Sequence, residues 1–380
     1  MSVLLTPVSG NKAQIIIKNL AKYKIKIITC DHEHISPGFF SKHSSKHYIT
    51  PSPVLNPVEY VHTLISIIQR ENIDVLLPVH STETLVISKY KEELEKYCHV
   101  PCSDYNTMLQ LHDKAKLYDL AVKLGLPVPL TFSANSYDEY TALKKKLKYP
   151  VVLKPKTESG SKGVKYANSE AQLDRYVNPI FRESFNNFPL IQEYIKGDGY
   201  GVSSIYDYGK LIAYITHKRL REYPLTGGPS TLRISTEHHE MEMIAMRLLT
   251  NVNWHGVAMV EFKLDKISGK PYIIEVNPRF WGSINQAISS GIDFPYLLYQ
   301  LEFQNEKNKD YTYKKGVKTQ FLTNDIRALC SEIIHTRDPN YIFKWINEMK
   351  TIDAIDEDFF GDPFFYMVFL IKEIKKLIIP

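Results

Sequence analysis

The sequence contains few cysteines and no apolar run long enough to cross a membrane. Its four cysteines, Cys30, Cys98, Cys102 and Cys330, show neither a disulfide framework nor a second Cys or His pair at zinc-finger spacing. They are therefore predicted to be reduced thiols. No apolar stretch approaches the roughly 20 residues of a transmembrane helix, and the opening MSVLLTPVSG lacks the regions of a signal peptide. We expect a cytoplasmic protein without an integral membrane segment.

A dense block of lysine and arginine is also missing. The net charge of +5 is mild, so nothing indicates nucleic acid binding, whereas small anionic substrates suit the slightly basic balance. With 44% hydrophobic and 23% charged residues, the composition is ordinary for a globular protein. The 380 residues leave room for two or three domains with sizeable cores.

Two familiar phosphate-binding motifs are absent as well. The first turn, PVSGN, is not a full G-x-G-x-x-G, and no Walker A loop is present. The first hundred residues nevertheless alternate strands with helices, which predicts a parallel sheet covered on both faces. The expected strands are Val3–Thr6, Lys26–Thr29 and Val75–Pro78, and the expected helices are Asn11–Tyr23, Pro57–Glu71 and Glu83–Lys96. A Rossmann-like domain without a dinucleotide fits this pattern.

The most informative segment is VAMVEFKLDKISGKPYIIEVNPRF. It predicts two strands, Val257–Leu264 and Pro271–Val276, joined by a turn. If the turn is centred on Ser268, Glu261 lies directly opposite Glu275. Two carboxylates roughly 5 Å apart across a strand pair repel each other. At an effective dielectric constant near 20, the repulsion is on the order of 3 kcal/mol.

A hard divalent cation held by carboxylate and amide oxygens would offset this repulsion. Asn277 shares the face of Glu275, and Arg279 adds a bidentate donor suited to phosphate or carboxylate. The alternative is a solvated hairpin whose acids point to water, but strands this apolar are typical of a buried sheet. The segment therefore predicts a Mg²⁺ and polyphosphate site.

A lysine and a glycine-containing loop precede this hairpin. Lys154 ends the expected strand Val151–Lys154, and the loop TESGSKG follows, in which backbone N–H groups can approach phosphates. Next come a strand beginning at Val164 and a strand Leu190–Ile195. The remaining expected elements are the helix Ser169–Val177, a hairpin of Val202–Tyr206 and Leu211–Ile215, a long loop Arg219–Leu232 and the helix Glu237–Thr250.

This order of lysine strand, glycine loop, apolar strand and paired acids resembles the ATP-grasp superfamily over about Leu109 to Leu301, with EVNPRFWGS as its most specific piece. The motifs HKRLREYP, GGPST and NPRFWGS are similar to a carboxylate–amine ligase branch related to the carbamoyl-phosphate synthase large chain. The resemblance implies an α/β (α+β ATP-grasp) fold. Its expected domains are a Rossmann-like pre-ATP-grasp domain (1–108), a small lobe (109–189), a metal and substrate lobe (190–305) and a C-terminal extension with a helical tail (306–380).

The resemblance also implies site residues and cofactors, namely ATP with Mg²⁺ or Mn²⁺. The expected metal ligands are Glu261, Glu275 and Asn277. The expected phosphate contacts are Lys114, Lys154 and the loop residues Ser159, Gly160, Ser161 and Gly163. Glu193, Tyr194 and Ile195 match the adenine hinge, and Arg279 matches the arginine that meets the transferring phosphoryl group. The family's ribose acid has no clear match, because the segment here is GDGYG, and Asp198 is its candidate.

Four further cations lie in HKRLREYPLTGGPSTLR, namely Lys218, Arg219, Arg221 and Arg233. Lys218 is expected beside the nucleotide, and Arg233 is expected to bind a substrate carboxylate or the acyl phosphate. The alternative interpretation is that they are surface cations on a long loop.

The implied function is an ATP-dependent ligase that joins a small-molecule carboxylate to an amine, with an amino acid as substrate and a homodimer as the usual assembly. A small-molecule kinase and a non-catalytic nucleotide-binding module are the alternatives. The C-terminal FFYMVFLIKEIKKLIIP is expected to pack on its own domain, with contact to a membrane surface or partner as the alternative.

Overall fold

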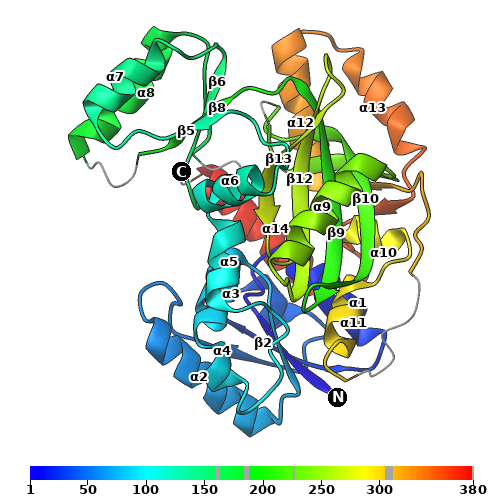
Figure 1. Ribbon diagram of the computed structural model, residues 1–380. Helices are drawn as coiled ribbons and strands as arrows, with labels where there is room; N and C mark the ends of the chain where they lie inside the picture. Colours follow the sequence, from blue (N-terminus) through cyan, green and yellow to red (C-terminus); the bar gives the residue numbers. More distant parts are fainter. Residues whose placement is uncertain (159–162, 184–187, 226, 304–310, 379–380) are drawn as a thin grey trace.

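Three sheets organise the chain. The computed structural model describes residues 1–158, 163–183, 188–225, 227–303 and 311–378 (Figure 1). A four-stranded sheet has the order β3-β2-β1-β4, a second four-stranded sheet has the order β5-β8-β6-β7, and a seven-stranded sheet has the order β13-β12-β9-β10-β11-β14-β15. The mixed α/β architecture predicted from the sequence is confirmed.

The N-terminal unit is the predicted Rossmann-like sheet, with all its strands parallel. Its strands are β1 (Ser2–Thr6), β2 (Lys26–Asp31), β3 (Lys46–Ile49) and β4 (Val75–Pro78), and its helices are α1 (Asn11–Ala21), η1 (Pro37–Phe40), α2 (Pro57–Glu71), α3 (Ser81–Lys89) and α4 (Lys91–Leu94). The strands β1 and β4 are buried along their whole length, as in other sheets covered on both faces. The single helix expected over Glu83–Lys96 is wrong, because Tyr90 leaves the helical conformation and separates α3 from α4.

The small lobe stands apart from the rest of the molecule in Figure 1 and has a hydrophobic core of its own. Its strands are β5 (Thr131–Phe132), β6 (Val151–Lys154), β7 (Lys165–Ala167) and β8 (Leu190–Glu193), and its helices are α7 (Tyr137–Lys144) and α8 (Glu170–Glu183). β8 pairs with β6, so the strand Leu190–Glu193 lies in this sheet and not with the paired acids.

The large sheet carries the predicted hairpin at one edge. Its strands are β9 (Gly197–Asp207), β10 (Lys210–Glu222), β11 (Ser230–Thr236), β12 (Gly256–Asp265), β13 (Pro271–Asn277), β14 (Lys318–Gln320) and β15 (Ala354–Ile355). One face packs on α5 (Tyr105–His112), α6 (Lys114–Lys123) and α9 (His239–Asn251). The other face shares a core with α1, α10 (Ile284–Ser289) and α11 (Phe294–Gln300). The sheet therefore joins the N-terminal unit directly.

The long loop expected over Arg219–Leu232 is wrong. β10 continues to Glu222 and β11 begins at Ser230, so half of that segment is strand and the loop covers only residues 223–229. The many charged residues made the segment resemble a solvent-exposed loop. In the structure, arginines of both strands form ion pairs within the protein instead.

The C-terminal segment folds back onto the N-terminal unit and the large sheet. It contains α12 (Leu322–Thr336), α13 (Tyr341–Met349) and α14 (Pro363–Ile378). Phe365, Tyr366 and Phe369 of α14 form a buried cluster, and the Tyr366 hydroxyl lies 2.5 Å from Asn11 Oδ1. The tail therefore packs on its own chain, while Phe364 and Ile371 stay exposed.

Two expectations about absences can be compared with the structure. Within the described residues, no helix has the length and apolar character needed to span a bilayer. The four cysteines are free thiols, with Cys330 exposed and the other three buried.

Candidate functional site

The two acids predicted to face each other do so. In the β12–β13 pair, Glu261 is opposite Glu275 and Met259 is opposite Asn277. The turn is not centred on Ser268, however, because Leu264 pairs with Pro271. One extra residue in β13 restores the predicted pairing.

That extra residue is Ile274, which forms a β-bulge between Ile273 and Glu275. A bulge leaves a backbone group without a partner in the ladder, and here the Tyr118 hydroxyl donates to the Ile274 carbonyl at 2.5 Å. α6 therefore fixes the bulge that aligns the two carboxylates.

The paired carboxylates are surrounded by donors. Asn277 Nδ2 lies 2.9 Å from Glu261 Oε1 and 3.4 Å from Glu275 Oε1. Lys114 Nζ lies 3.4 Å from Glu275 Oε2, and Arg219 forms an ion pair with Glu261. Both acids are largely buried, with side-chain exposures of 14% and 19%. Two carboxylates and an amide in one buried place fit the oxygen donors that a hard divalent cation requires.

Their surroundings shift the pKa values of the two acids apart. Burial raises the pKa of Glu261, and the neighbouring Glu275 adds to that rise, while Arg219 opposes it. Burial also acts on Glu275, but Lys114 and Lys154 outweigh it and hold the pKa of Glu275 below its ordinary value. Of the two acids, Glu275 is therefore the one whose surroundings favour the charged form.

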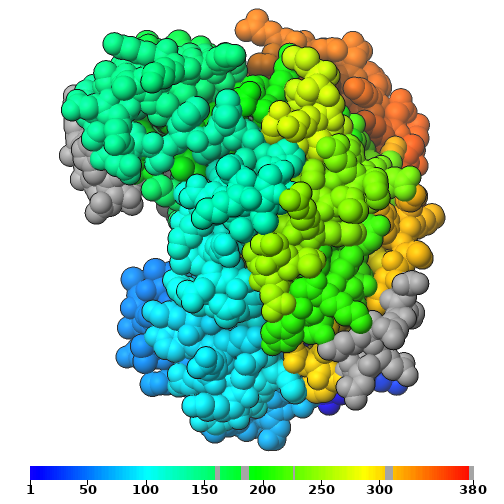
Figure 2. Space-filling model, viewed as in Figure 1, coloured from blue at the N-terminus to red at the C-terminus, as the bar shows by residue number. Residues whose placement is uncertain are grey.

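The predicted lysines and hinge line one cavity with these acids. Its lining includes Lys114, Lys154, Glu193, Tyr194, Ile195, Glu261 and Glu275. Lys154 is 8% exposed, and burial lowers its pKa to about 8. Lys114 Nζ donates to the Glu158 carbonyl at 2.6 Å. The space-filling view shows the molecule hollowed beneath the small lobe (Figure 2).

Other predicted contacts either fall outside the described residues or do not line the cavity. Ser159, Gly160 and Ser161 fall outside the described residues. Gly163 has φ +73°, and a Cβ there would come within 2.8 Å of Pro155 Cγ, so this turn requires glycine. The candidate ribose acid Asp198 is paired with Lys218 at 2.7 Å and with Lys266 at 3.2 Å, and neither Asp198 nor Lys218 lines the cavity.

Arg279 points from the hairpin toward the N-terminal unit. Its Nε donates to Ser81 Oγ at 2.9 Å, at the first residue of α3, and its Nη1 donates to the Phe280 carbonyl at 2.6 Å. Lys12 of α1 donates to the same carbonyl at 3.1 Å. The N-terminal unit thus positions the arginine that the resemblance assigns to the transferring phosphoryl group.

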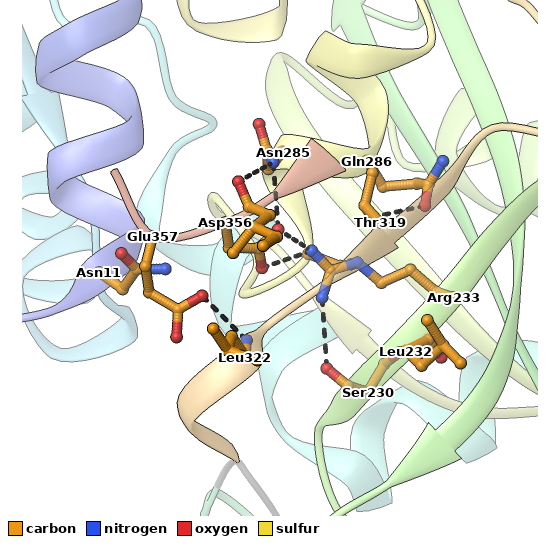
Figure 3. Close-up of polar contacts among 12 residues, drawn as sticks. Asn11, Ser230, Leu232, Arg233, Asn285, Gln286, Thr319, Leu322, Asp356 and Glu357 are labelled. Atoms are coloured by element: carbon orange, nitrogen blue, oxygen red, sulfur yellow. Dashed lines mark hydrogen bonds and ion pairs between the residues drawn. The ribbon is translucent and has the colours of Figure 1, made fainter. Parts of the chain in front are cut away.

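The structure does not bring Arg233 to the cavity. Its guanidinium is fully buried and forms an ion pair with both carboxylate oxygens of Asp356, which follows β15 (Figure 3). Asn285 of α10 donates to the same carboxylate at 3.2 Å. A carboxylate of the chain itself therefore takes the place expected for a substrate carboxylate.

Arg219 also lines the cavity. The sequence did not single it out from the other cations of its segment, Lys218, Arg221 and Arg233, as a site residue. A regular strand would place Arg219 and Arg221 on one face, but the β10–β11 register shifts between them. Arg219 consequently reaches Glu261, while Arg221 pairs with Asp325 at 2.5 Å. Nothing in the spacing of the sequence indicates that irregularity.

Gly199 of β9 leaves room for the Arg219 side chain to reach Glu261. β9 lies between β10 and β12, and a Cβ at Gly199 would come within 2.9 Å of Arg219 Cδ and 2.8 Å of Glu222 Oε1. Gly199, the central glycine of GDGYG, is therefore explained by the need to leave room for this side chain.

A larger cavity of about 830 Å³ lies elsewhere, between α3–α4, the start of α5 and the β9–β10 turn. Its lining includes Lys91, Tyr208 and His255, and none of the residues predicted for catalysis or for ATP and metal binding. The charged groups expected of a polyphosphate site converge in the smaller cavity, which is therefore the candidate site.

Comparisons with known proteins agree with the fold. Residues 111–283 match the family model described as the ATP-grasp domain. The carbamoyl phosphate synthase large chain of Pyrococcus furiosus is 30% identical over 173 residues, which cover 44% of this chain and 16% of that protein. The chain spans less than half the length of the curated relatives it matches.

Two solved structures share the fold. The biotin carboxylase of Campylobacter jejuni, in a complex with β,γ-ATP, has a TM-score of 0.68 at 16% identity and covers 83% of this chain and 74% of that one. The L-amino acid ligase of Bacillus licheniformis has a TM-score of 0.63 at 18% identity and covers 79% of this chain and 73% of that one. At these identities the likeness shows the fold alone.

Proposed function

Because residues 111–283 form an ATP-grasp domain, we propose that this chain is an ATP-dependent carboxylate–amine ligase. A substrate carboxylate would attack the γ-phosphate of ATP, releasing ADP and forming an acyl phosphate. An amine nitrogen would then displace phosphate and form an amide or peptide-like bond, with an amino acid as one substrate. The observation that carries the proposal is the opposed pair Glu261 and Glu275 in one cavity with two buried lysines.

The residues suit this chemistry because neither step needs a protein nucleophile. Lys114 and Lys154 would bind the phosphates of ATP, and residues 193–195 would face the adenine at the end of β8. Glu261, Glu275 and Asn277 would hold Mg²⁺ or Mn²⁺, which would neutralise the phosphate charge when bound.

Further ligands for that cation would come from the phosphates or from water. The described part of the chain contains no group of three or more His, Cys, Asp or Glu side chains able to hold a metal ion. Two carboxylates and an amide leave much of an octahedral shell to other oxygens, as is usual where Mg²⁺ is bound together with a nucleotide.

ATP affinity is expected to fall as pH rises above 8. Burial lowers the pKa of Lys154 to about 8, so the unliganded protein loses this positive charge as pH rises through that value. Bound phosphate would favour the charged amine, so binding would take up a proton, and the Kd for ATP should rise by up to about tenfold per pH unit. Calorimetric titrations from about pH 7 to about pH 9.5 would measure this.

Lys154→Arg is the matched control, since a guanidinium keeps its charge throughout this range. Its ATP affinity should change much less with pH than that of the wild-type protein. A wild-type Kd that is constant across the range would contradict the assignment of Lys154 to the phosphates.

The test of the proposed function is phosphate release from Mg²⁺-ATP with amino acids and small carboxylates, singly and in pairs. Product masses are determined by mass spectrometry. Turnover that requires a pair, with a product mass equal to the sum minus water, would support the ligase. Phosphorylation of a single compound would contradict it and identify a kinase.

A further inference from the structure

The Arg219 guanidinium and a divalent cation compete for the same carboxylate. Arg219 Nη2 is ion-paired with Glu261 Oε2, and Glu261 is one of the three metal ligands in the proposed function. Glu275 is balanced by Lys114 at 3.4 Å. With both acids already paired to a cation, a divalent ion would add charge to a site that is close to neutral. Displacing one of the two cations from its acid would keep the site close to neutral when the metal binds.

Arg219 is the cation with a second carboxylate within reach. Its Nη1 lies 3.4 Å from Glu222 Oε1 and 3.4 Å from the Gly228 carbonyl. Lys114, in contrast, is held by the Glu158 carbonyl at 2.6 Å and by the N-terminus of α6. Glu222 could keep Arg219 charged and inside the cavity after Glu261 is given up to the metal.

Arg219 also has a donor to spare. Its Nε is buried and has no hydrogen-bond partner among the residues that the structure describes. A buried N–H without an acceptor is costly, and groups of this kind usually find a partner in the protein or a ligand. Because Arg219 lines the cavity with both lysines, the acceptor that fits is an oxygen of a phosphate or of a substrate carboxylate.

We propose that Arg219 is the internal counter-ion of Glu261. A divalent cation displaces Arg219 from Glu261, and Arg219 then serves as a positioning cation for the anionic reactants. This proposal rests on the metal assignment of the proposed function and extends it. It makes Arg219 the side chain that links metal binding to the charge balance of the cavity.

The test measures Mn²⁺ binding to the full chain without nucleotide, using the electron paramagnetic resonance signal of free Mn²⁺. Arg219→Gln removes the competing charge and should bind Mn²⁺ about tenfold more tightly than the wild-type protein. It should also gain more in thermal midpoint on Mn²⁺ addition, because the ion replaces the missing counter-charge. Arg219→Lys keeps the charge and should bind Mn²⁺ as the wild-type protein does.

Arg221→Gln is the matched control on the same strand. Arg221 pairs with Asp325 and Glu348, away from the cavity, so its loss should lower stability without changing Mn²⁺ affinity. An equal gain in Mn²⁺ affinity in Arg221→Gln would overturn the proposal, and so would unchanged or weaker binding in Arg219→Gln.

Glu261→Gln separates this proposal from the proposed function. If Glu261→Gln loses the Mn²⁺ binding seen in the wild-type protein while Arg219→Gln binds like wild type, only the role of Arg219 fails. If neither the wild-type protein nor Arg219→Gln binds Mn²⁺ without nucleotide, the displacement proposal fails, and turnover of Glu261→Gln with Mg²⁺-ATP then decides the metal assignment separately.

Discussion

Replacing Glu275 by glutamine is expected to abolish turnover of Mg²⁺-ATP while leaving the fold intact. The amide keeps the shape of the side chain but removes a charged metal ligand and the partner of Lys114. A loss of at least about a thousandfold in kcat is expected, roughly 4 kcal/mol of transition-state stabilisation. Phosphate release gives the rate, and circular dichroism checks the fold.

Glu237→Gln controls for the loss of a carboxylate as such. Glu237 is exposed, lies outside the cavity and pairs with Lys315, so its replacement should leave turnover at the wild-type level. If Glu275→Gln keeps near-normal activity, the metal assignment is wrong. If it fails to fold, Glu275 is required for the structure, and turnover of Glu261→Gln then tests the metal assignment.

The second large effect concerns stability. Asp356→Asn removes the counter-charge of a fully buried guanidinium, that of Arg233. Breaking one partner of a buried ion pair typically costs about 3–5 kcal/mol, because the remaining charge is left in a low-dielectric interior. Urea denaturation should show a loss of this size in the free energy of unfolding.

Two further variants sharpen this test. Asp353→Asn changes an exposed acid whose side chain accepts from the Lys318 amide, and it should cost less than about 1 kcal/mol. The double variant Arg233→Met with Asp356→Leu replaces the pair by apolar side chains and should recover much of the stability. If Asp356→Asn is stable but shows a raised KM, Arg233 binds substrate as the sequence alone suggested.

The hairpin could be predicted because its signal is local. Strand alternation and a short turn are enough to place Glu261 opposite Glu275, and the register confirms the pairing. The bulge at Ile274 could not be predicted, since it depends on Tyr118, which is 156 residues away in the sequence. The predicted turn centre is half a residue away from the observed one, and the bulge compensates for this difference. The predicted pairing of Glu261 with Glu275 is therefore correct.

The roles of the arginines could not be predicted for the same physical reason. The roles of Arg219 and Arg233 are set by irregular β-strands and by acids distant in sequence, of which Asp356 lies 123 residues from Arg233. Residue type and spacing carry no information about such partners. The sequence therefore predicts a substrate contact for Arg233, whereas in the structure Arg233 and Arg221 hold the C-terminal segment.

The return of the C-terminal segment to the N-terminal unit has a consequence for synthesis. Tyr366 meets Asn11 across 355 residues of sequence, and the ion pair of Lys18 with Asp358 at 2.6 Å spans a similar distance. Contacts of such large sequence separation form late, because the chain between them has to be ordered first. During synthesis, the unit containing β1–β4 would thus wait, with the surface around η1 and α1 uncovered, until residues 356–366 have emerged.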